Sequence, residues 1–350
     1  MAAEVGSLQR TRLALSGRLG SWIFFGAWIA AFAVLIVPRI LPNPAFFVQI
    51  LVYGVTQGAI YALIALGYTL VYGIIELINF AHGDVFTLGA FISLALFGAI
   101  GIHPGQASQL GLLLLPAILG VMLATMLLNG AVNVTIERVA YRPLRNAPRL
   151  APLITAIGMS FVLEGIMFLW KGPNYITYPD LLPGARIPIG GGASIGAKDL
   201  IVIAVAVVLV LLLTAFIELT RLGKAMRATA QDRDAAQLMG IDINRTIAAT
   251  FFIGAVLAAA GGMIFGLYFP SSLNFQLGFS AGLAAFTSAV LGGIGNIRGA
   301  ALGGLLIGLV RTFNDGYGRS EWSDILVFVI LVLVLTFRPT GLLGIQAPGK

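Results

Sequence analysis

Apolar stretches long enough to cross a lipid bilayer recur along the whole of this chain. A membrane-spanning helix needs about 20 mainly apolar residues. Hydrophobic residues make up 59% of the sequence and charged residues only 10%, whereas soluble domains carry roughly 25% charged residues. The sequence therefore predicts an all-α fold, a polytopic membrane helix bundle with about ten transmembrane helices. The predicted spans are 22–37, 46–66, 85–102, 110–132, 152–170, 200–219, 247–268, 280–295, 299–313 and 324–337.

The stretch 67–84 is apolar, but it is not an uninterrupted span. It mixes glycines with amide and ionisable side chains, namely Gly67, Gly73, Gly83, Glu76, Asn79, His82 and Asp84. Irregular backbone at membrane depth is tolerated only where protein or a water-filled cavity surrounds it. We therefore expect a broken or re-entrant segment near 67–84.

The distribution of basic residues predicts the orientation, because cytoplasmic loops carry an excess of Lys and Arg. With the N-terminus in the cytoplasm and ten alternating spans, most of the 21 basic residues fall on cytoplasmic pieces. Both termini are then cytoplasmic. This bias also accounts for the net charge of +7 without a nucleic-acid partner. The outer pieces hold only Arg39, Lys171, Arg186, Lys198, Arg311 and Arg319.

Several kinds of chemistry are disfavoured by the residue inventory. The chain has no Cys and two His, which excludes disulfides and thiol catalysis and argues against a zinc site. No Gly-x4-Gly-Lys-[Ser/Thr] phosphate-binding loop occurs. We therefore expect no catalytic residue, metal or cofactor in this chain, and no enzyme activity. Residues 1–37 could be read as a signal peptide, but a retained first span fits the long apolar part better.

A polar stripe runs along the second predicted span. At 100° per residue, its members fall within about 140° of arc on a regular helix. Amide and phenol groups are costly against lipid, so this face should point inward. It could line a solute path or make hydrogen bonds between helices. The stripe consists of Gln49, Tyr53, Gln57, Tyr61, Tyr68 and Tyr72; our path candidates are Gln57, Tyr61 and Tyr68, joined by Asn79 and His82 from the broken segment.

The loop 218–245 combines helix-forming residues with charges of both signs. Ala228, Ala235, Leu238 and Met239 would give a short surface helix an apolar side. Such a helix suits docking into a groove on a cytosolic partner. A solvated loop helix and a contact with lipid headgroups are the alternatives.

Three motifs resemble one known family. They are Gly58-Ala-Ile-Tyr-Ala-Leu-Ile-Ala-Leu-Gly-Tyr-Thr-Leu-Val-Tyr-Gly73 with Ile78-Asn-Phe-Ala-His-Gly-Asp84, then Leu291-Gly-Gly-Ile-Gly-Asn-Ile-Arg-Gly-Ala-Ala-Leu-Gly-Gly304, and the loop sequence Asp234-Ala-Ala-Gln-Leu-Met-Gly240. The first two resemble the LivH-type permease of bacterial branched-chain amino acid ABC importers. The third is similar to the Glu-Ala-Ala-x3-Gly coupling loop of ABC permeases, with Asp in place of Glu. The resemblance covers about 46–345 as one permease transmembrane domain, and residues 1–45 form an N-terminal extension with the first span.

The resemblance implies a subunit of the bacterial inner membrane that works within a larger importer. Its expected partners are a second, related permease (a heterodimer rather than a homodimer), two cytosolic ABC ATPases that hold ATP and Mg²⁺, and an extracytoplasmic solute-binding protein. The implied cargo is a branched-chain amino acid. The implied ATPase-coupling residues are Asp234, Ala235, Ala236 and Gly240.

Two other functions remain open on the residues alone. The same kind of ABC permease could carry urea or short amides. A secondary transporter driven by an ion gradient could use the Gly-rich breaks 73–84 and 291–299 as paired half-helices of an inverted repeat. A membrane-embedded enzyme has little support.

Overall fold

The computed structural model describes residues 42–76, 78–104, 111–145, 147–148, 150–190 and 192–344. The predicted first span, 22–37, lies outside these residues. Seven of the described helices are long and apolar enough to cross a bilayer, and α10 is a shorter apolar helix. A polytopic helix bundle is thus confirmed. The helices are α2 (Pro44–Ile75), α3 (His82–Ala99), α4 (Leu114–Ile136), α5 (Leu150–Lys171), α6 (Ala197–Leu219), α7 (Arg221–Gln231), α8 (Arg233–Leu238), α9 (Ile243–Tyr268), α10 (Leu277–Gly292), α11 (Ile297–Tyr317) and α12 (Ser323–Phe337).

Short elements extend or connect these helices. A π-helical turn, Glu137–Tyr141, and a 3₁₀ turn, Arg142–Leu144, prolong α4. Two further 3₁₀ turns, Gly111–Leu113 and Ser320–Trp322, precede α4 and α12. The strands β1 (Arg186–Gly190) and β2 (Ala193–Gly196) pair antiparallel as a hairpin.

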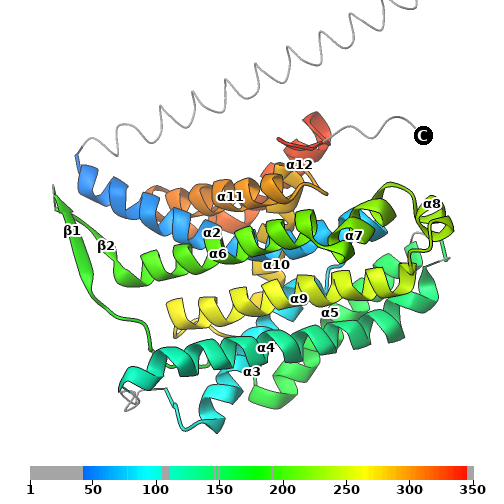
Figure 1. The fold of residues 1–350 in the computed structure, drawn as a ribbon. Coiled ribbons are helices and arrows are strands. Elements are labelled where there is room, and N and C mark those ends of the chain that lie inside the picture. Colours follow the sequence, from blue (N-terminus) through cyan, green and yellow to red (C-terminus); the bar gives the residue numbers. More distant parts are fainter. Residues whose placement is uncertain are drawn as a thin grey trace, which may run out of the picture.

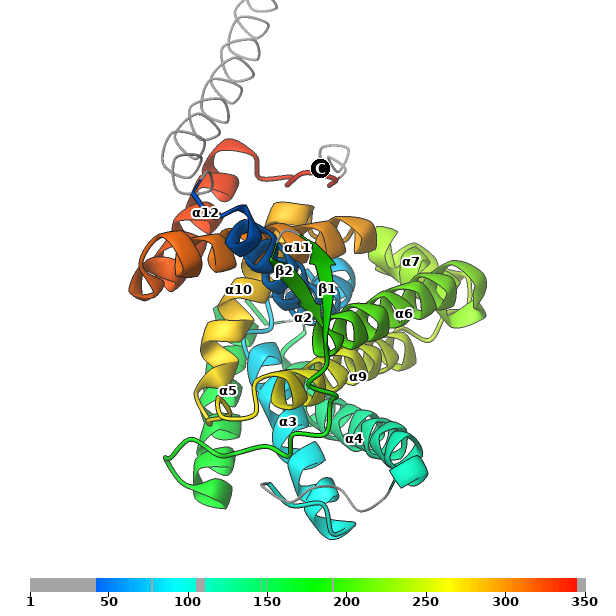
Figure 2. The ribbon, with the colours of Figure 1, turned by 90° about the vertical axis from the view of Figure 1, so that its left-hand side faces the viewer.

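The bundle has two distinct ends. In Figure 1 the hairpin β1–β2 lies at the left and the helices α7 and α8 lie at the right, and the long helices run between them. We call these the hairpin end and the loop end. Figure 2 looks onto the hairpin end and shows α2 in the middle, with α6, α9, α3, α10 and α11 around it. Helix α2 is accordingly buried over most of its length, apart from its first turns at the hairpin end, whereas α4, α5, α6 and α12 leave most of their apolar surface uncovered, as lipid-facing helices do.

Small residues bring α2 and α11 into close contact. A β-carbon at Gly58 would lie 2.7 Å from the Leu305 Cα, and one at Gly304 would lie 2.6 Å from the Ala62 Cα. Membrane helices gain little from excluding water, so they associate mainly through close backbone packing of this kind. Because the two helices run antiparallel, α11 begins at the loop end.

The broken segment is shorter than the predicted 67–84, because α2 continues as a helix to Ile75. Gly67 and Gly73 do not interrupt it. A β-carbon at Gly67 would collide with the His82 imidazole, and one at Gly73 would touch Gly295. These glycines therefore serve close packing. The residue that ends α2 is Glu76, whose backbone is left-handed with φ 58° and whose N–H donates to the Tyr72 carbonyl at 2.8 Å.

Helix α3 begins inside the bundle. His82, its first residue, lies against Gly67 of α2 and Gly254 of α9. Gly67 is about 12 Å from the loop end of α2 at 1.5 Å per residue. The described residues of 76–81 therefore lead from the loop end back into the protein: Glu76 and Phe80 are still exposed, whereas Asn79 and Ala81 are buried. The interruption expected within 67–84 is therefore the non-helical stretch between Ile75 and the start of α3 at His82.

Candidate functional site

The predicted coupling residues lie on and just after α8, at the loop end. Asp232 caps this helix, and its Oδ1 accepts hydrogen bonds from the backbone N–H of Asp234 at 2.9 Å and of Ala235 at 3.0 Å. Asp234 and Ala235 are exposed, whereas Ala236 is buried beneath the helix. The structure therefore presents one face of α8 outward and anchors the other.

Gly240 turns the chain away from α8. Its φ is +83°, in the left-handed region that glycine adopts without strain, and a β-carbon there would meet no atom within 4 Å. The Ile241 N–H donates to the Ala236 carbonyl at 3.0 Å, which closes the turn. The turn leaves Leu238 and Met239 with 89% and 83% of their surface exposed. Two apolar side chains thus project from the tip of this loop.

Arg233 connects α8 to the end of α2. Its guanidinium donates to the Ile74 carbonyl, with Nη2 at 2.7 Å and Nε at 3.3 Å. Ile74 belongs to the last turn of α2, immediately before the left-handed Glu76. The last turn of a helix leaves carbonyl groups without partners, so this side chain satisfies one of them. A displacement of α8 would therefore act directly on the point where α2 ends.

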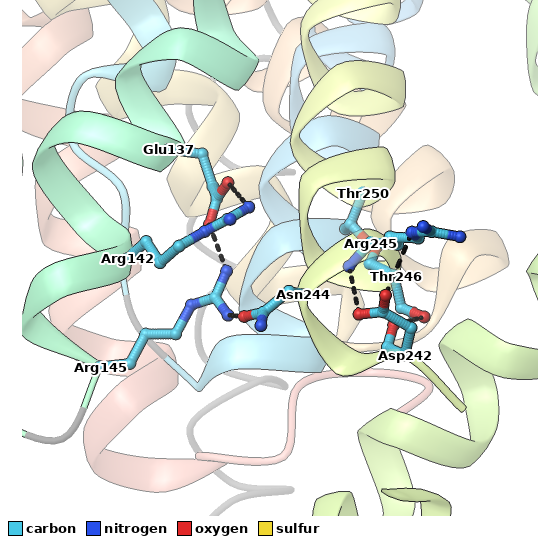
Figure 3. Close-up of polar contacts among 8 residues, drawn as sticks. All are labelled: Glu137, Arg142, Arg145, Asp242, Asn244, Arg245, Thr246 and Thr250. Carbon is cyan, nitrogen blue, oxygen red and sulfur yellow. Dashed lines mark hydrogen bonds and ion pairs between the residues drawn. The ribbon is translucent and has the colours of Figure 1, made fainter. Parts of the chain in front are cut away.

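A buried acid organises the neighbouring π-helical turn. Glu137 is fully buried, and its carboxylate pairs with Arg142 at 3.0 Å and with Arg145. Figure 3 shows both guanidinium groups converging on it. Arg145 also donates to Asn244 Oδ1 at 2.6 Å, in the first turn of α9. Burial lowers the pKa of the Arg145 guanidinium, and the Glu137 carboxylate opposes that shift.

The hydrogen bond between Arg145 and Asn244 joins the Glu137 cluster to the loop after α8. Asp242 caps α9, since its Oδ1 accepts from the Arg245 N–H at 3.0 Å, and its Oδ2 lies 3.1 Å from Arg245 Nε. Figure 3 places this cap on the opposite side of the same helix end from Asn244. The segment that leaves α8 is thereby fixed to α9 and, through Arg145, to the end of α4.

The path candidates fall into separate groups. Gln57 and Tyr61 form the first with Thr312 of α11: Thr312 Oγ1 donates to Gln57 Oε1 at 3.0 Å, and Gln57 Nε2 donates to the Tyr61 hydroxyl at 2.8 Å. This chain of hydrogen bonds lies toward the hairpin end. Tyr53 of the same stripe is 43% exposed there.

Tyr68 and His82 form the second group, deeper in the bundle. Both are buried, and their rings meet edge to face with centroids 4.8 Å apart. Asn79 points elsewhere, toward the end of α4, where its Oδ1 accepts from the Tyr141 hydroxyl at 2.7 Å. The structure thus places the five candidates at three levels of the bundle.

Two features were not anticipated from the sequence. Asp199 is buried at the start of α6, with its Oδ1 2.5 Å from the Tyr268 hydroxyl and 3.1 Å from Thr56 Oγ1. Glu137 is the other. Each is a lone acid at the end of a strongly apolar helix, and Glu137 has Arg at positions five and eight residues later. An acid placed there, where lipid contact would be costly, is the signal that could have found them.

The comparison with known families settles what kind of chain this is. Residues 50–335 match the family described as branched-chain amino acid transport system / permease component. The chain belongs to this family. Because the match spans most of the bundle, the family's permease domain includes α8, the broken segment and the polar groups along α2.

Individual relatives agree. The permease is 42% identical over 303 residues to the high-affinity branched-chain amino acid transport system permease protein LivH of Salmonella typhimurium, covering 85% of this chain and 96% of the relative. It is 43% identical over 310 residues to the corresponding permease BraD of Pseudomonas aeruginosa, covering 87% and 98%. Among solved structures, PsaBC from Streptococcus pneumoniae in complex with Fab aligns over 91% of this chain and 96% of its own, at 13% identity and a TM-score of 0.43.

Proposed function

We propose that this permease is one of two membrane subunits of an ATP-driven importer for branched-chain amino acids. A second, related permease completes the membrane part. Two separate cytosolic ATPases supply the energy with ATP and Mg²⁺, and an extracytoplasmic binding protein delivers the amino acid. The cargo follows from the names of the relatives, which are permeases of branched-chain amino acid transport systems.

The loop end is the cytoplasmic end in this proposal. Basic residues are concentrated there, as the orientation rule for membrane proteins requires. They include Arg142, Arg145, Arg221, Arg233 and Arg298. The N- and C-termini then both lie in the cytoplasm, and the hairpin end faces the binding protein.

The observation that carries the proposal is the form of α8. Leu238 and Met239 project into open surroundings, and an apolar tip of this kind suits a hydrophobic groove on a partner protein. The Arg233 contact with Ile74 then links the docked tip to the end of α2. Movement of an ATPase subunit would reach the broken segment through Arg233 and also through Arg145 at the end of α4, where Tyr141 donates to Asn79.

The transport mechanism that fits this arrangement is alternating access, with ATP used to switch between states. The polar groups at three levels of the bundle would line the route when neighbouring helices move. A ligand can shift such an equilibrium only through different affinities for the two states. Here the ATPase subunits supply that difference by docking on α8.

The coupling role is tested by replacing 234–240 with a flexible Gly-Ser linker of the same length. We expect the variant to insert into the membrane and to lose ATP-dependent leucine uptake. Replacing the exposed hydrophobic residues, as Leu238→Ser with Met239→Ser, should weaken association with the ATPase subunits in co-purification. Normal uptake by the linker variant would refute the assignment.

The cargo is tested in the reconstituted complex by measuring the ATPase rate with and without leucine-loaded binding protein. Leucine-dependent stimulation is the expected result. Stimulation by urea or a short amide instead would support the assignment as an ATP-driven importer but would change the assigned cargo. An ATPase rate that responds to neither, with uptake that follows an ion gradient, would favour a secondary transporter.

A further inference from the structure

A cavity of about 550 Å³ opens near the hairpin end, outside the groups assigned above to coupling. Four separate parts of the chain wall it: α2, the segment through the hairpin into α6, the end of α9, and α11. Binding sites for small molecules usually measure about 300–1,000 Å³. The cavity is therefore large enough for a free amino acid.

Two opposite charges face this cavity without a charged partner. Arg186 stands exposed at the rim, on the first residue of β1, and Asp199 is buried at the base, in the first turn of α6. Among the described residues, neither of them forms an ion pair. Lys198, which also lines the cavity, is already paired with Asp180 at 2.6 Å.

The two charges are held in place by the fold. Arg186 pairs in register with Gly196, and the Gly196 N–H donates to Asp199 Oδ2 at 3.1 Å. Thr56 of α2 and Tyr268 of α9 approach the other oxygen of the same carboxylate. Three elements therefore hold Asp199 in place. A buried carboxylate is costly unless it is paired or hydrogen bonded, and these contacts supply the hydrogen bonds but no positive charge. A ligand cation in the cavity would be attracted to it.

Aromatic rings supply the remaining surface. Tyr53, Tyr268 and Phe269 line the cavity, and Tyr268 and Phe269 pack edge to face with centroids 4.6 Å apart. These rings offer apolar faces to an aliphatic side chain. A cation, an anion and an aromatic surface that line one cavity match the three groups of an aliphatic amino acid.

We propose that this cavity is a binding site for the zwitterion of an aliphatic amino acid. Arg186 contacts the α-carboxylate, Asp199 attracts the α-ammonium, and the aromatic wall receives the side chain. The inference rests on the proposed function, since it names the place where this permease takes the amino acid. A neutral solute such as urea would make no use of two opposite charges.

The site also adjoins the polar path. Gln57 and Thr312 line the cavity, and the hydrogen bond between them, 3.0 Å long, joins α2 to α11. Beyond Gln57 lies the buried Tyr61 hydroxyl. The pair therefore lies between the site and Tyr61.

The test compares ligands that lack one charge with variants that lack the matching residue. The complete membrane complex (both permeases and both ATPases, in lipid nanodiscs) is assayed for displacement of radiolabelled leucine. The competitors are leucine, leucinamide, which has no carboxylate, and 4-methylpentanoate, which has no ammonium. The variants are Arg186→Gln and Asp199→Asn; the amide of Asn keeps an oxygen that can accept from Gly196. Arg319→Gln, near the same end but outside the cavity lining, is the control.

Removing one charge-assisted hydrogen bond should weaken leucine binding by about tenfold or more. Arg186→Gln should show this loss for leucine and none for leucinamide. Asp199→Asn should show it for leucine and none for 4-methylpentanoate, whereas Arg319→Gln should change nothing. Circular dichroism and gel filtration establish that each variant is folded. If Asp199→Asn fails to fold, the comparison of leucine with leucinamide in Arg186→Gln decides the test, because Arg186 is exposed and its replacement should not disturb folding.

Leucine binding that Arg186→Gln leaves unchanged, or weakens equally for leucine and leucinamide, would overturn the inference. So would a wild-type complex that imports leucine yet binds none in this assay. Uptake of leucine by the same complex with binding protein and ATP is measured in parallel. If uptake occurs and the charge comparison fails, this site alone is wrong; if uptake fails, the proposed cargo is wrong.

Discussion

Glu137 shows how much can depend on one buried side chain. Its carboxylate pairs with both Arg142 and Arg145, and the second of these reaches α9. Breaking a fully buried pair by removing one partner typically costs about 3–5 kcal/mol, but Arg142 and Arg145 keep 36% and 14% of their side chains exposed, so solvent screens the charges that remain. We expect Glu137→Gln to lower the stability of the permease by about 2 kcal/mol, the usual cost of losing a hydrogen bond to a charged group, measured as thermal unfolding of the purified protein.

The matched control is Glu218→Gln. Glu218 forms an exposed pair with Arg298 at 3.4 Å, and such pairs contribute only about 0–1 kcal/mol. If both variants melt at the wild-type temperature, the Glu137 cluster does not stabilise the fold.

Gly240 allows a second prediction at this scale. The surroundings are open, so a methyl group would meet no neighbour, and only the left-handed backbone resists substitution. A non-glycine residue in this conformation costs roughly 1–2 kcal/mol. Gly240→Ala should therefore distort the turn after α8 and reduce ATPase-coupled uptake, while Gly240→Asn, which tolerates this conformation better, should retain more of it.

Gly158 provides the control for that substitution. It lies within helix α5 with open space around its Cα, so Gly158→Ala should be neutral or slightly stabilising. Equal losses of uptake in the two alanine variants would show that the backbone conformation of Gly240 does not matter.

At the scale of helices, the close packing of α2 against α11 determines whether the helix bundle can fold. A side chain at Gly58 would have to displace the backbone of Leu305, and backbone moves far less easily than a flexible side chain. We expect Gly58→Val to reduce the amount of folded permease in membranes severely. Gly120→Val, at a position of α4 with no atom within 4 Å, should be tolerated apart from a small propensity cost. Similar losses in both variants would contradict the packing role.

The helices could be predicted from the sequence because each depends on its own apolar length. The packing role of Gly67 and Gly73 could not be predicted from the sequence. A glycine that interrupts a helix and a glycine that lets a neighbouring helix approach cannot be told apart until the neighbour is known. Here the neighbours are His82 and Gly295. The loop carrying Asp234 was predictable from its motif, whereas the cavity between Arg186 and Asp199 also requires Tyr53 and Thr312 from distant parts of the chain.

At the scale of the whole molecule, the orientation can be read directly, because the chain contains no Cys. Ile189→Cys places a single thiol on the hairpin, and Leu238→Cys places one on the tip after α8; both residues are exposed. In spheroplasts, a membrane-impermeant maleimide should label the first variant at once and the second only after permeabilisation. The reverse pattern would invert the bundle and place α8 out of reach of any cytosolic ATPase.

The start of α3 inside the bundle has a consequence for biosynthesis. His82 and Asp84 are polar residues that the finished protein covers with Gly254 of α9 and Gly278 of α10. The ribosome makes both of these helices long after α3. Until they arrive, the nascent chain holds an imidazole and a carboxyl group at a depth where lipid solvates neither. Insertion of helix α3 in the order of synthesis is therefore costly until the helices that cover these two residues have been made.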